Sequence, residues 1–371
     1  MKPHHNVPSW SDKDILILRS LPRMTTKRFR FALEHTSCLE HFLSIDAEQP
    51  SATLRMELGS EMFNIARVAE EADRILERCA RSQVAIVSIC NDQYPRLLRQ
   101  IPYPPNLLFV RGMLQHPDAL SLSIVGTRQC TQYGQAVTEE FARECGRAGL
   151  IITSGLAAGI DSIAHKAAVE SGAVTYAVIA CGIDMIGPSY AARLALAISD
   201  NGGAIISEYP CGVRALPAYF PQRNRIISGI SRALLVVESG KRGGSLITAQ
   251  FAMDQSREVY AVPGMISAER SMGTNALIAN NTAIAALSPS QILLDYGIDS
   301  AAVAQPAPEF GSELEQRVFE NIDHRSVHLD DVAEQLAASS SDVLVCALTL
   351  EFKGYVRQLP GRMFVRMMKI Q

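Results

Sequence analysis

Residues 120–128 of this 371-residue chain read Leu-Ser-Leu-Ser-Ile-Val-Gly-Thr-Arg, an apolar run of strand length followed directly by a glycine turn. Similar short runs rich in β-branched residues alternate with helical segments on both sides of it. They cover residues 84–89, 150–153, 174–180, 204–206, 233–237 and 259–262. Continuous apolar strands that alternate with helices predict an α/β fold, with a doubly wound, Rossmann-like parallel sheet that is covered on both faces.

Four segments are predicted around this sheet. Residues 1–82 show apolar residues at helical spacing and predict a small helical, SAM-like domain, and residues 83–298 hold the Rossmann-like domain. The alanine- and proline-rich residues 299–310 have linker composition. Residues 311–371 predict three helices and a two-stranded wing, which together indicate a winged helix.

The amino-acid composition is typical of a folded globular protein. Hydrophobic residues make up 47%, charged residues 20%, and the net charge is −3, so any nucleic-acid site must come from local clustering. The eight cysteines include no Cys-x-x-Cys pair, which argues against zinc and redox motifs. No secretory signal and no membrane-length apolar run stand out, so we expect a cytoplasmic protein without a membrane partner.

Small residues follow three of the predicted strands, where a doubly wound sheet binds its ligands. The turns are Gly126-Thr127-Arg128, then residues 154–161, and residues 238–245. Glycine lets backbone amides approach an anion, and the following helix presents its positive end. Three such turns at one edge predict a phosphate-binding surface, and the place of Arg128 after a strand favours a phosphate contact.

The ligand is predicted to be a nucleic-acid strand and not a dinucleotide. Neither Gly-x-Gly-x-x-Gly nor the Walker A pattern follows any strand, so no nucleotide cofactor is expected, and no metal-ligand or catalytic set can be assembled. Residues 210–253 instead hold six basic residues and one acid, Glu238. Within them, residues 219–225 place two aromatics beside two arginines, a combination suited to unpaired bases and phosphates. The alternative is that the aromatics pack a loop while the arginines cap a helix.

These motifs resemble the DNA-processing protein A family, called DprA or Smf. The resemblance rests on Gly126-Thr127-Arg128, residues 154–161, Phe-Pro-Gln-Arg-Asn-Arg-Ile-Ile-Ser at 220–228, Gly-Gly-Ser-Leu-Ile-Thr-Ala at 243–249, and flanking Gln-Tyr-Pro and Val-Pro-Gly motifs at 93–95 and 262–264. It implies a protein that binds single-stranded DNA during natural transformation, protects it and loads the recombinase RecA. It also implies a homodimer through the end of the Rossmann domain, at Leu277, Ile278 and Ile284.

By motif position, Arg128 would contact a phosphate and Phe220 a base. The complete predicted set for single-stranded DNA is Gly126, Thr127, Arg128, Ser154, Gly155, Gly159, Phe220, Arg223, Asn224, Arg225, Lys241, Gly243, Gly244 and Ser245. Many relatives carry a lysine three residues before the motif phenylalanine, and here that position is Pro217. Either this protein binds the DNA strand more weakly, or other basic residues (Arg214, Arg223 or Lys241) replace the contact of that lysine.

Two rival functions remain as alternatives. Nucleotide phosphoribohydrolases have a similar fold and a Gly-Gly-x-Gly-Thr-x-x-Glu motif, but Gln250 stands where the catalytic glutamate would be, so no enzyme activity is expected. A duplex-binding regulator would use the winged helix. Residues 309–342 hold nine acids and two basic residues, and the presumed recognition helix has no Lys or Arg before Lys353. Protein contacts or modest backbone contacts are therefore expected there.

Overall fold

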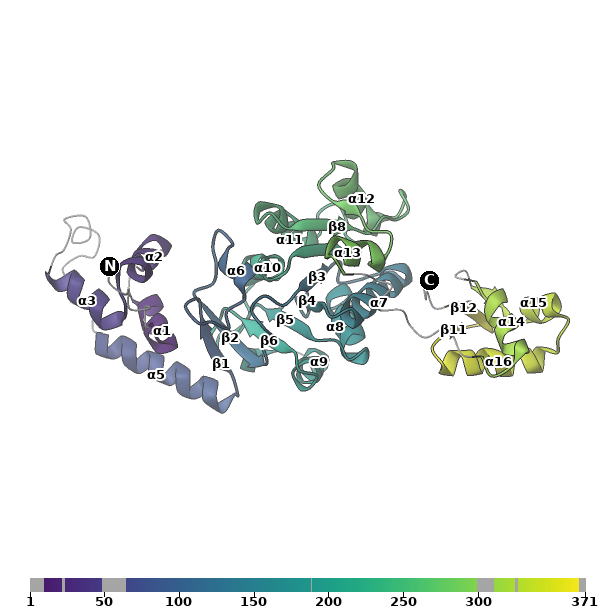
Figure 1. The fold of residues 1–371 in the computed structure, drawn as a ribbon, viewed down its shortest axis with the longest axis horizontal. Coiled ribbons are helices and arrows are strands. Elements are labelled where there is room, and N and C mark those ends of the chain that lie inside the picture. The colour runs from purple at the N-terminus through teal and green to yellow at the C-terminus, as the bar shows by residue number, and fades with distance from the viewer. Residues whose placement is uncertain are drawn as a thin grey trace, which may run out of the picture. The chain divides into compact units, whose positions relative to one another are not determined.

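The computed structural model describes residues 10–21, 24–48, 65–187, 189–298, 310–323 and 326–366. The chain divides into two compact units, Met1–Ser300 and Ala301–Gln371 (Figure 1). The predicted linker, residues 299–310, lies outside the described residues except for Phe310.

A nine-stranded sheet forms the centre of the first unit, in the order β1-β2-β6-β5-β4-β3-β7-β8-β9. The strands are β1 (Ala85–Ser88), β2 (Leu107–Gly112), β3 (Ser121–Val125), β4 (Ile151–Ser154), β5 (Thr175–Ile179), β6 (Ala204–Ser207), β7 (Ala233–Val236), β8 (Glu258–Ala261) and β9 (Ile284–Ala285). From β6 to β9 every pair is parallel. The predicted Rossmann-like parallel sheet is confirmed.

One edge of the sheet differs from the prediction. Strand β1 pairs with β2 in antiparallel fashion, and β2 pairs with β6 in the same way. The sequence pattern placed β1 among the parallel strands and did not identify β2 or β9. The connection between β1 and β2 contains only a four-residue helix, α6 (Arg96–Arg99), and not the longer crossover helix that usually joins parallel neighbours.

Helices cover both faces of the sheet because its strands are apolar on both sides (Figure 1). In β3, Leu122 and Ile124 belong to one buried cluster and Val125 to another. The first cluster includes α7 (Gln132–Arg147), α8 (Ile160–Glu170) and α13 (Pro289–Asp295), and the second includes α10 (Tyr219–Ile230) and α11 (Gly244–Asp254). The remaining helices of this part are α9 (Ser189–Asp200), α12 (Met272–Ala279), η1 (Ile183–Met185) and η2 (Glu269–Ser271).

The described residues before the sheet form the helices α1 (Asp12–Ser20), α2 (Thr26–His35), α3 (Leu39–Glu48) and α5 (Ile65–Arg81). Ser11 begins α1 with a capping box to Asp14. The buried side chains of these helices share one core with β2, β5, β6 and α9. An ion pair of 2.8 Å between Arg78 of α5 and Asp184 of η1 adds a polar contact between the helices and the sheet.

The second unit is a winged helix. It contains α14 (Glu313–Asn321), α15 (Leu329–Leu336) and α16 (Ser340–Phe352), with a small sheet in the order β10 (Val327–His328), β12 (Met363–Arg366), β11 (Val356–Leu359). Ser339 caps α16 by accepting the amide of Asp342. Gly354, with a φ of +73°, ends the helix and lets the chain turn into the wing. The predicted helices and wing are confirmed.

Candidate nucleic-acid interface

The strand order reverses between β3 and β7, so the carboxyl ends of these neighbouring strands mark the switch point of the doubly wound sheet. A cleft of about 420 Å³ opens there. Its lining includes the turn after β3, the start of α10 and the turn into α11. Of the predicted residues, the following line it: Gly126, Thr127, Arg128, Phe220, Arg223, Asn224, Gly243, Gly244 and Ser245.

Backbone hydrogen bonds hold the three glycine turns together. The Thr127 amide donates to the Glu238 carbonyl at 2.9 Å, and the Thr127 carbonyl accepts from the Ile160 amide at 3.2 Å. Gly159 has a φ of +80°, and a side chain there would overlap the carbonyls of Thr127 and Arg128. Glycine at 159 therefore lets the β4 turn close against the β3 turn, which fixes the position of Arg128.

The first turn of α11 is open to a ligand. Gly243 occupies the N-cap position with no side-chain capping bond, and the amides of Gly244 and Ser245 have no acceptor within the described part of the chain. The Ser245 hydroxyl is turned toward the protein and donates to Ser239 Oγ at 2.9 Å. Free amides at the positive end of an 11-residue helix suit a phosphate oxygen.

Glu238, the single acid of residues 210–253, is kept away from the cleft. Its side chain is 2% exposed and does not line the cleft. Its carboxylate accepts the amide of Thr131 at 2.9 Å and the Thr131 hydroxyl at 2.5 Å, at the N-terminus of α7. The negative charge is thus bound by a helix end and does not oppose an anion at the cleft.

Arg128 and Phe220 lie together at this cleft. Both are exposed, and the Arg128 guanidinium carbon is 5.8 Å from the centre of the Phe220 ring. A cation at this distance from a ring is within the range of a weak cation–π contact. One side chain can hold a phosphate while the ring beside it stacks on a base.

Arg223 has a different environment from the one its motif suggested. It is 5% exposed, and its Nη1 donates to the carbonyl of Gly155 at 2.7 Å and also to the carbonyl of Val178. Burial lowers its pKa, while the nearby Asp161 carboxylate opposes that shift. Burial likewise raises the pKa of Asp161, against the effect of Arg223. A Cβ at Gly155 would overlap this guanidinium, so the glycine makes room for it. Arg223 therefore fixes the floor of the cleft.

Five predicted residues do not line the cleft. The Ser154 hydroxyl is buried and donates to the Ile124 carbonyl at 2.6 Å, which ties β4 to β3. Gly155 and Gly159 shape the turn behind the cleft, as described above. Arg225 is directed away and pairs with Glu208 at 2.8 Å, and Lys241 is exposed in the neighbouring turn.

The sequence did not single out several residues that the structure adds to the site. Gln129 and Ile247 are exposed and line the cleft next to predicted turns. Adjacency along the chain was the only signal for Gln129, whereas Ile247 also lies in the motif at 243–249. Tyr219, one of the two aromatics that the sequence placed beside the arginines, does not line the cleft and stacks on Tyr209 with ring centres 4.2 Å apart. Pro217 is exposed in the segment before α10, as is Arg214, which the sequence offered as a compensating cation.

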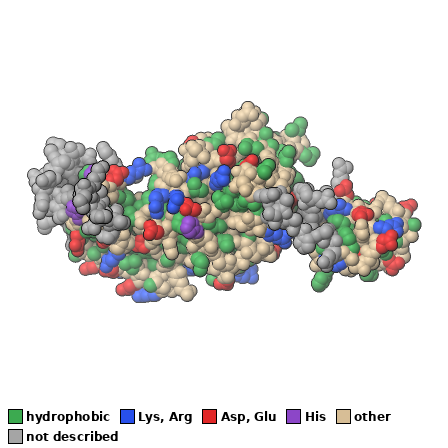
Figure 2. Space-filling view, viewed as in Figure 1, with side chains coloured by type: hydrophobic (Ala, Val, Ile, Leu, Met, Phe, Trp, Pro, Cys, Tyr) green, Lys and Arg blue, Asp and Glu red, His purple; other side chains and the backbone are tan. Residues whose placement is uncertain are grey.

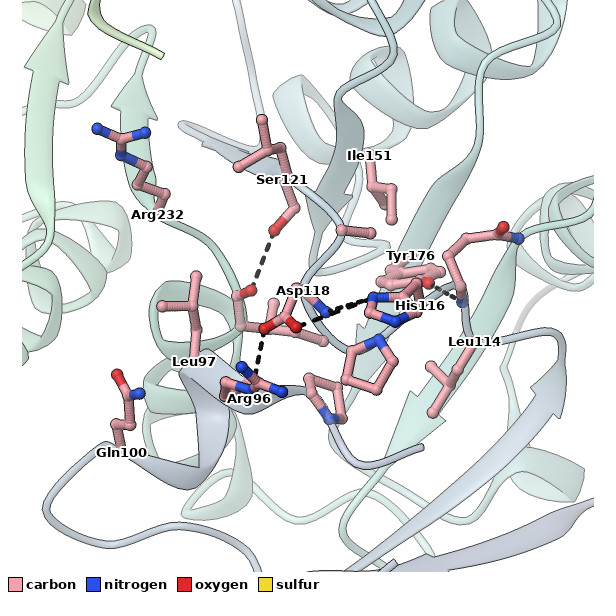
Figure 3. A pocket seen from close by; sticks show the side chains of 16 residues that line it. Arg96, Leu97, Gln100, Leu114, His116, Asp118, Ser121, Ile151, Tyr176 and Arg232 are labelled. Atoms are coloured by element: carbon pink, nitrogen blue, oxygen red, sulfur yellow. Dashed lines mark hydrogen bonds and ion pairs between the residues drawn. The ribbon is translucent and has the colours of Figure 1, made fainter. Parts of the chain in front are cut away.

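A second cavity, of about 270 Å³, lies at the opposite edge of the sheet, among the first residues of β3, β4 and β5 (Figure 3). Its polar groups bind one another. Arg96 pairs with Asp118 at 3.0 Å, and the Gln115 amide donates to the Tyr176 hydroxyl at 2.5 Å. Because these polar groups are already paired, the cleft at the carboxyl ends of the strands is the better anion site.

The face of the molecule shown in Figure 2 has basic and acidic side chains interspersed over it, in keeping with the small net charge.

Other kinds of site receive no support within the described ranges. No group of three His, Cys, Asp or Glu residues there could hold a metal ion. No helix among those residues is long and apolar enough to cross a membrane. Gln250, at the position of the hydrolase glutamate, is exposed on α11 and donates to Asp254 at 2.8 Å, outside the cleft lining.

Comparison with known proteins decides the family. The family model described as DNA recombination-mediator protein A matches residues 85–297, which are more than half of the chain. The chain belongs to the DprA/Smf family. A second model, the DprA winged helix domain, matches residues 301–362. The family resemblance stated from the sequence is confirmed.

Individual DprA/Smf proteins are similar over most of the chain. Protein Smf of Escherichia coli K12 is 38% identical over 283 residues, covering 72% of this chain and 73% of that protein. The X-ray structure of DprA from Streptococcus pneumoniae superposes with a TM-score of 0.61 at 32% identity, covering 77% of this chain and 98% of that one. DprA from Helicobacter pylori, described for its single-stranded DNA binding mode, gives 0.53 at 26% identity, covering 58% and 95%.

Proposed function

We propose that the cleft at the switch point binds single-stranded DNA without catalysing a reaction. One observation carries the proposal: Arg128 and Phe220 lie together, exposed, at the cleft. The N-terminus of α11, which has no side-chain cap, lines the same cleft. A phosphate would bind Arg128 and the amides of Gly244 and Ser245, and a base would stack on Phe220. The H. pylori relative, whose structure is described for this ligand, supports the same assignment.

A strand explains the cleft better than a free dinucleotide does. The dinucleotide fingerprint is absent after every strand. A duplex is disfavoured because its bases are stacked on one another and leave no free face for Phe220.

Binding to single-stranded and duplex DNA of equal length, across a range of salt, tests this function. We expect preferential binding of the single strand, with affinity that falls steeply as salt rises. Equal or better binding of the duplex would contradict the proposal. Incubation with nucleoside monophosphates provides the second arm, because release of a free base would support the hydrolase instead.

The cellular role is proposed from the family. A cytoplasmic protein of this kind would protect DNA taken up during natural transformation and load RecA onto it. The test is strand exchange by RecA on DNA covered with single-strand-binding protein. We expect this chain to shorten the lag of the reaction, and an unchanged lag would remove RecA loading from the proposal while leaving DNA binding intact.

We also propose a homodimer through the β9 edge of the sheet. Ile284 lies on this outermost strand and is 43% exposed, and the nearby Leu287 is 74% exposed. Leu277 and Ile278, at the end of α12, are half-buried. We expect Ile284→Glu to shift the protein from dimer to monomer in sedimentation equilibrium, whereas Ile247→Glu, an exposed isoleucine of the cleft, should leave it dimeric. A variant at 284 that stays dimeric would refute this interface.

A further inference from the structure

The turn that follows β8 presents two aliphatic side chains to solvent. Met265 is 75% exposed and Ile266 92%. The turn is nevertheless firmly held, because the Gly264 amide donates to Asn275 Oδ1 at 3.1 Å and Asn275 Nδ2 donates to the Gly264 carbonyl at 3.0 Å. A Cβ at Gly264 would overlap the Ser271 hydroxyl, so the turn packs closely on η2. Met265 and Ile266 are therefore displayed from a well-defined turn.

The segment that leads into α7 connects this turn to the cleft. Gln129 lines the cleft, and its Oε1 accepts a hydrogen bond from Arg270 Nη2 at 3.4 Å. Tyr133, in the first turn of α7, donates its hydroxyl to the Pro263 carbonyl at 2.9 Å, and its side chain is 46% exposed. Ser239 also lines the cleft, and its amide donates to the Arg270 carbonyl at 2.7 Å. The turn after β8 therefore adjoins the cleft through direct contacts.

Basic residues outnumber acids in the two turns on this side of the cleft. Residues 240–243 and 262–271 contain Lys241, Arg242 and Arg270 against one acid, Glu269. Lys241 and Arg242 are exposed, and Arg270 is half-buried. Since exposed cations beside a cleft attract a polyanion, the charge of this surface favours the phosphate backbone of a nucleic acid over an apolar partner.

We propose that single-stranded DNA continues from the cleft across this surface, where Tyr133, Met265, Ile266 and Arg270 form a second subsite. This inference rests on the proposed DNA-binding function of the cleft. Arg270 binds a phosphate of the strand as it passes Gln129, and a base stacks on the Tyr133 ring. Met265 and Ile266 contact the faces of neighbouring bases, as methionine and isoleucine wedges do in other complexes with DNA.

Binding of oligothymidylates of increasing length, from about 4 to about 20 nucleotides, tests this path. Tyr133→Ala should weaken binding of the longest strands by about 5- to 150-fold, because it removes the face on which a base stacks. The shortest strands, which the cleft alone can hold, should bind as they do to wild type. Tyr190→Ala removes an exposed tyrosine from α9 and is the matched control, with wild-type binding expected at every length.

Arg128→Ala, measured on the same strands, separates the two sites. It should weaken binding at every length, whereas Tyr133→Ala should affect only the long strands. Wild-type binding by Arg128→Ala would therefore refute the cleft, and wild-type binding of long strands by Tyr133→Ala would refute the second subsite.

Two further variants exclude other roles for this turn. Tyr133→Phe keeps the ring and loses only the bond to the Pro263 carbonyl, so it should bind long strands within a few-fold of wild type. If it binds them as weakly as Tyr133→Ala, the hydroxyl fixes the turn and no base stacks on the ring. Ile266→Glu should weaken binding of long strands and leave the oligomeric state unchanged in sedimentation equilibrium. An Ile266→Glu protein that binds long strands like wild type but has become monomeric would assign the turn to an interface between two copies and overturn the proposal.

Discussion

Replacing Arg223 with alanine is expected to lower the free energy of unfolding by about 3 to 5 kcal/mol. Its guanidinium is buried, donates to the carbonyls of Gly155 and Val178, and lies near the buried Asp161. Removing it leaves the Asp161 carboxylate and two carbonyls without their partner. Urea unfolding followed by circular dichroism measures the loss.

Two further variants test whether the loss of stability comes from the buried guanidinium. Asn224→Ala, at the adjacent position of the same helix, should cost less than about 1 kcal/mol because Asn224 is only half-buried. Adding Asp161→Asn to Arg223→Ala should restore part of the loss, since it removes the uncompensated charge. An Arg223→Ala protein of wild-type stability that binds DNA weakly would contradict this account and make Arg223 a direct ligand of the strand.

Replacing Phe220 with alanine is expected to weaken binding of single-stranded DNA by about 5- to 150-fold, because stacking of a base on an aromatic ring contributes about 1 to 3 kcal/mol. The fold should be little changed, since the ring is 36% exposed and lines the cleft. Fluorescence anisotropy with a labelled oligonucleotide measures the affinity.

Phe220→Trp provides the matched control for that loss. An indole offers a comparable stacking face, so this variant should bind within a few-fold of wild type. If Phe220→Ala binds as tightly as wild type, no base stacks on the ring. If both variants bind weakly, the ring has a packing role instead.

The sequence predicted the parallel sheet, and it also predicted the turns that the proposed cleft brings together, because both depend on local patterns. A short apolar run ending in glycine, as at Ile124-Val125-Gly126, specifies a strand and its turn with little help from distant residues. The antiparallel edge was not predicted, since the pairing of β2 with β6 depends on which strand is free to accept it. Local pattern carries no such information.

The directions of the arginine side chains were also beyond the sequence pattern. Once α10 is known to begin at Tyr219, helical spacing places Phe220, Arg223, Asn224 and Ile227 on one face, and all four line the cleft. Arg225 lies about 100° beyond Asn224 around the helix, off this face, and pairs with Glu208 instead. When the first residue of the helix is not known, the sequence gives no reason to distinguish Arg223, Asn224 and Arg225.

The most direct test of the DNA-binding cleft is the salt dependence of single-stranded DNA binding by Arg128→Ala. Arg147→Ala serves as control, because Arg147 is an exposed arginine at the far end of α7 and the charge change is the same. If Arg128 neutralises one phosphate, the slope of log K against log salt should become shallower by about 0.7, and affinity at low salt should fall by about tenfold. The Arg147→Ala protein should match wild type. An Arg128→Ala protein with wild-type affinity and slope would place the strand elsewhere on the molecule.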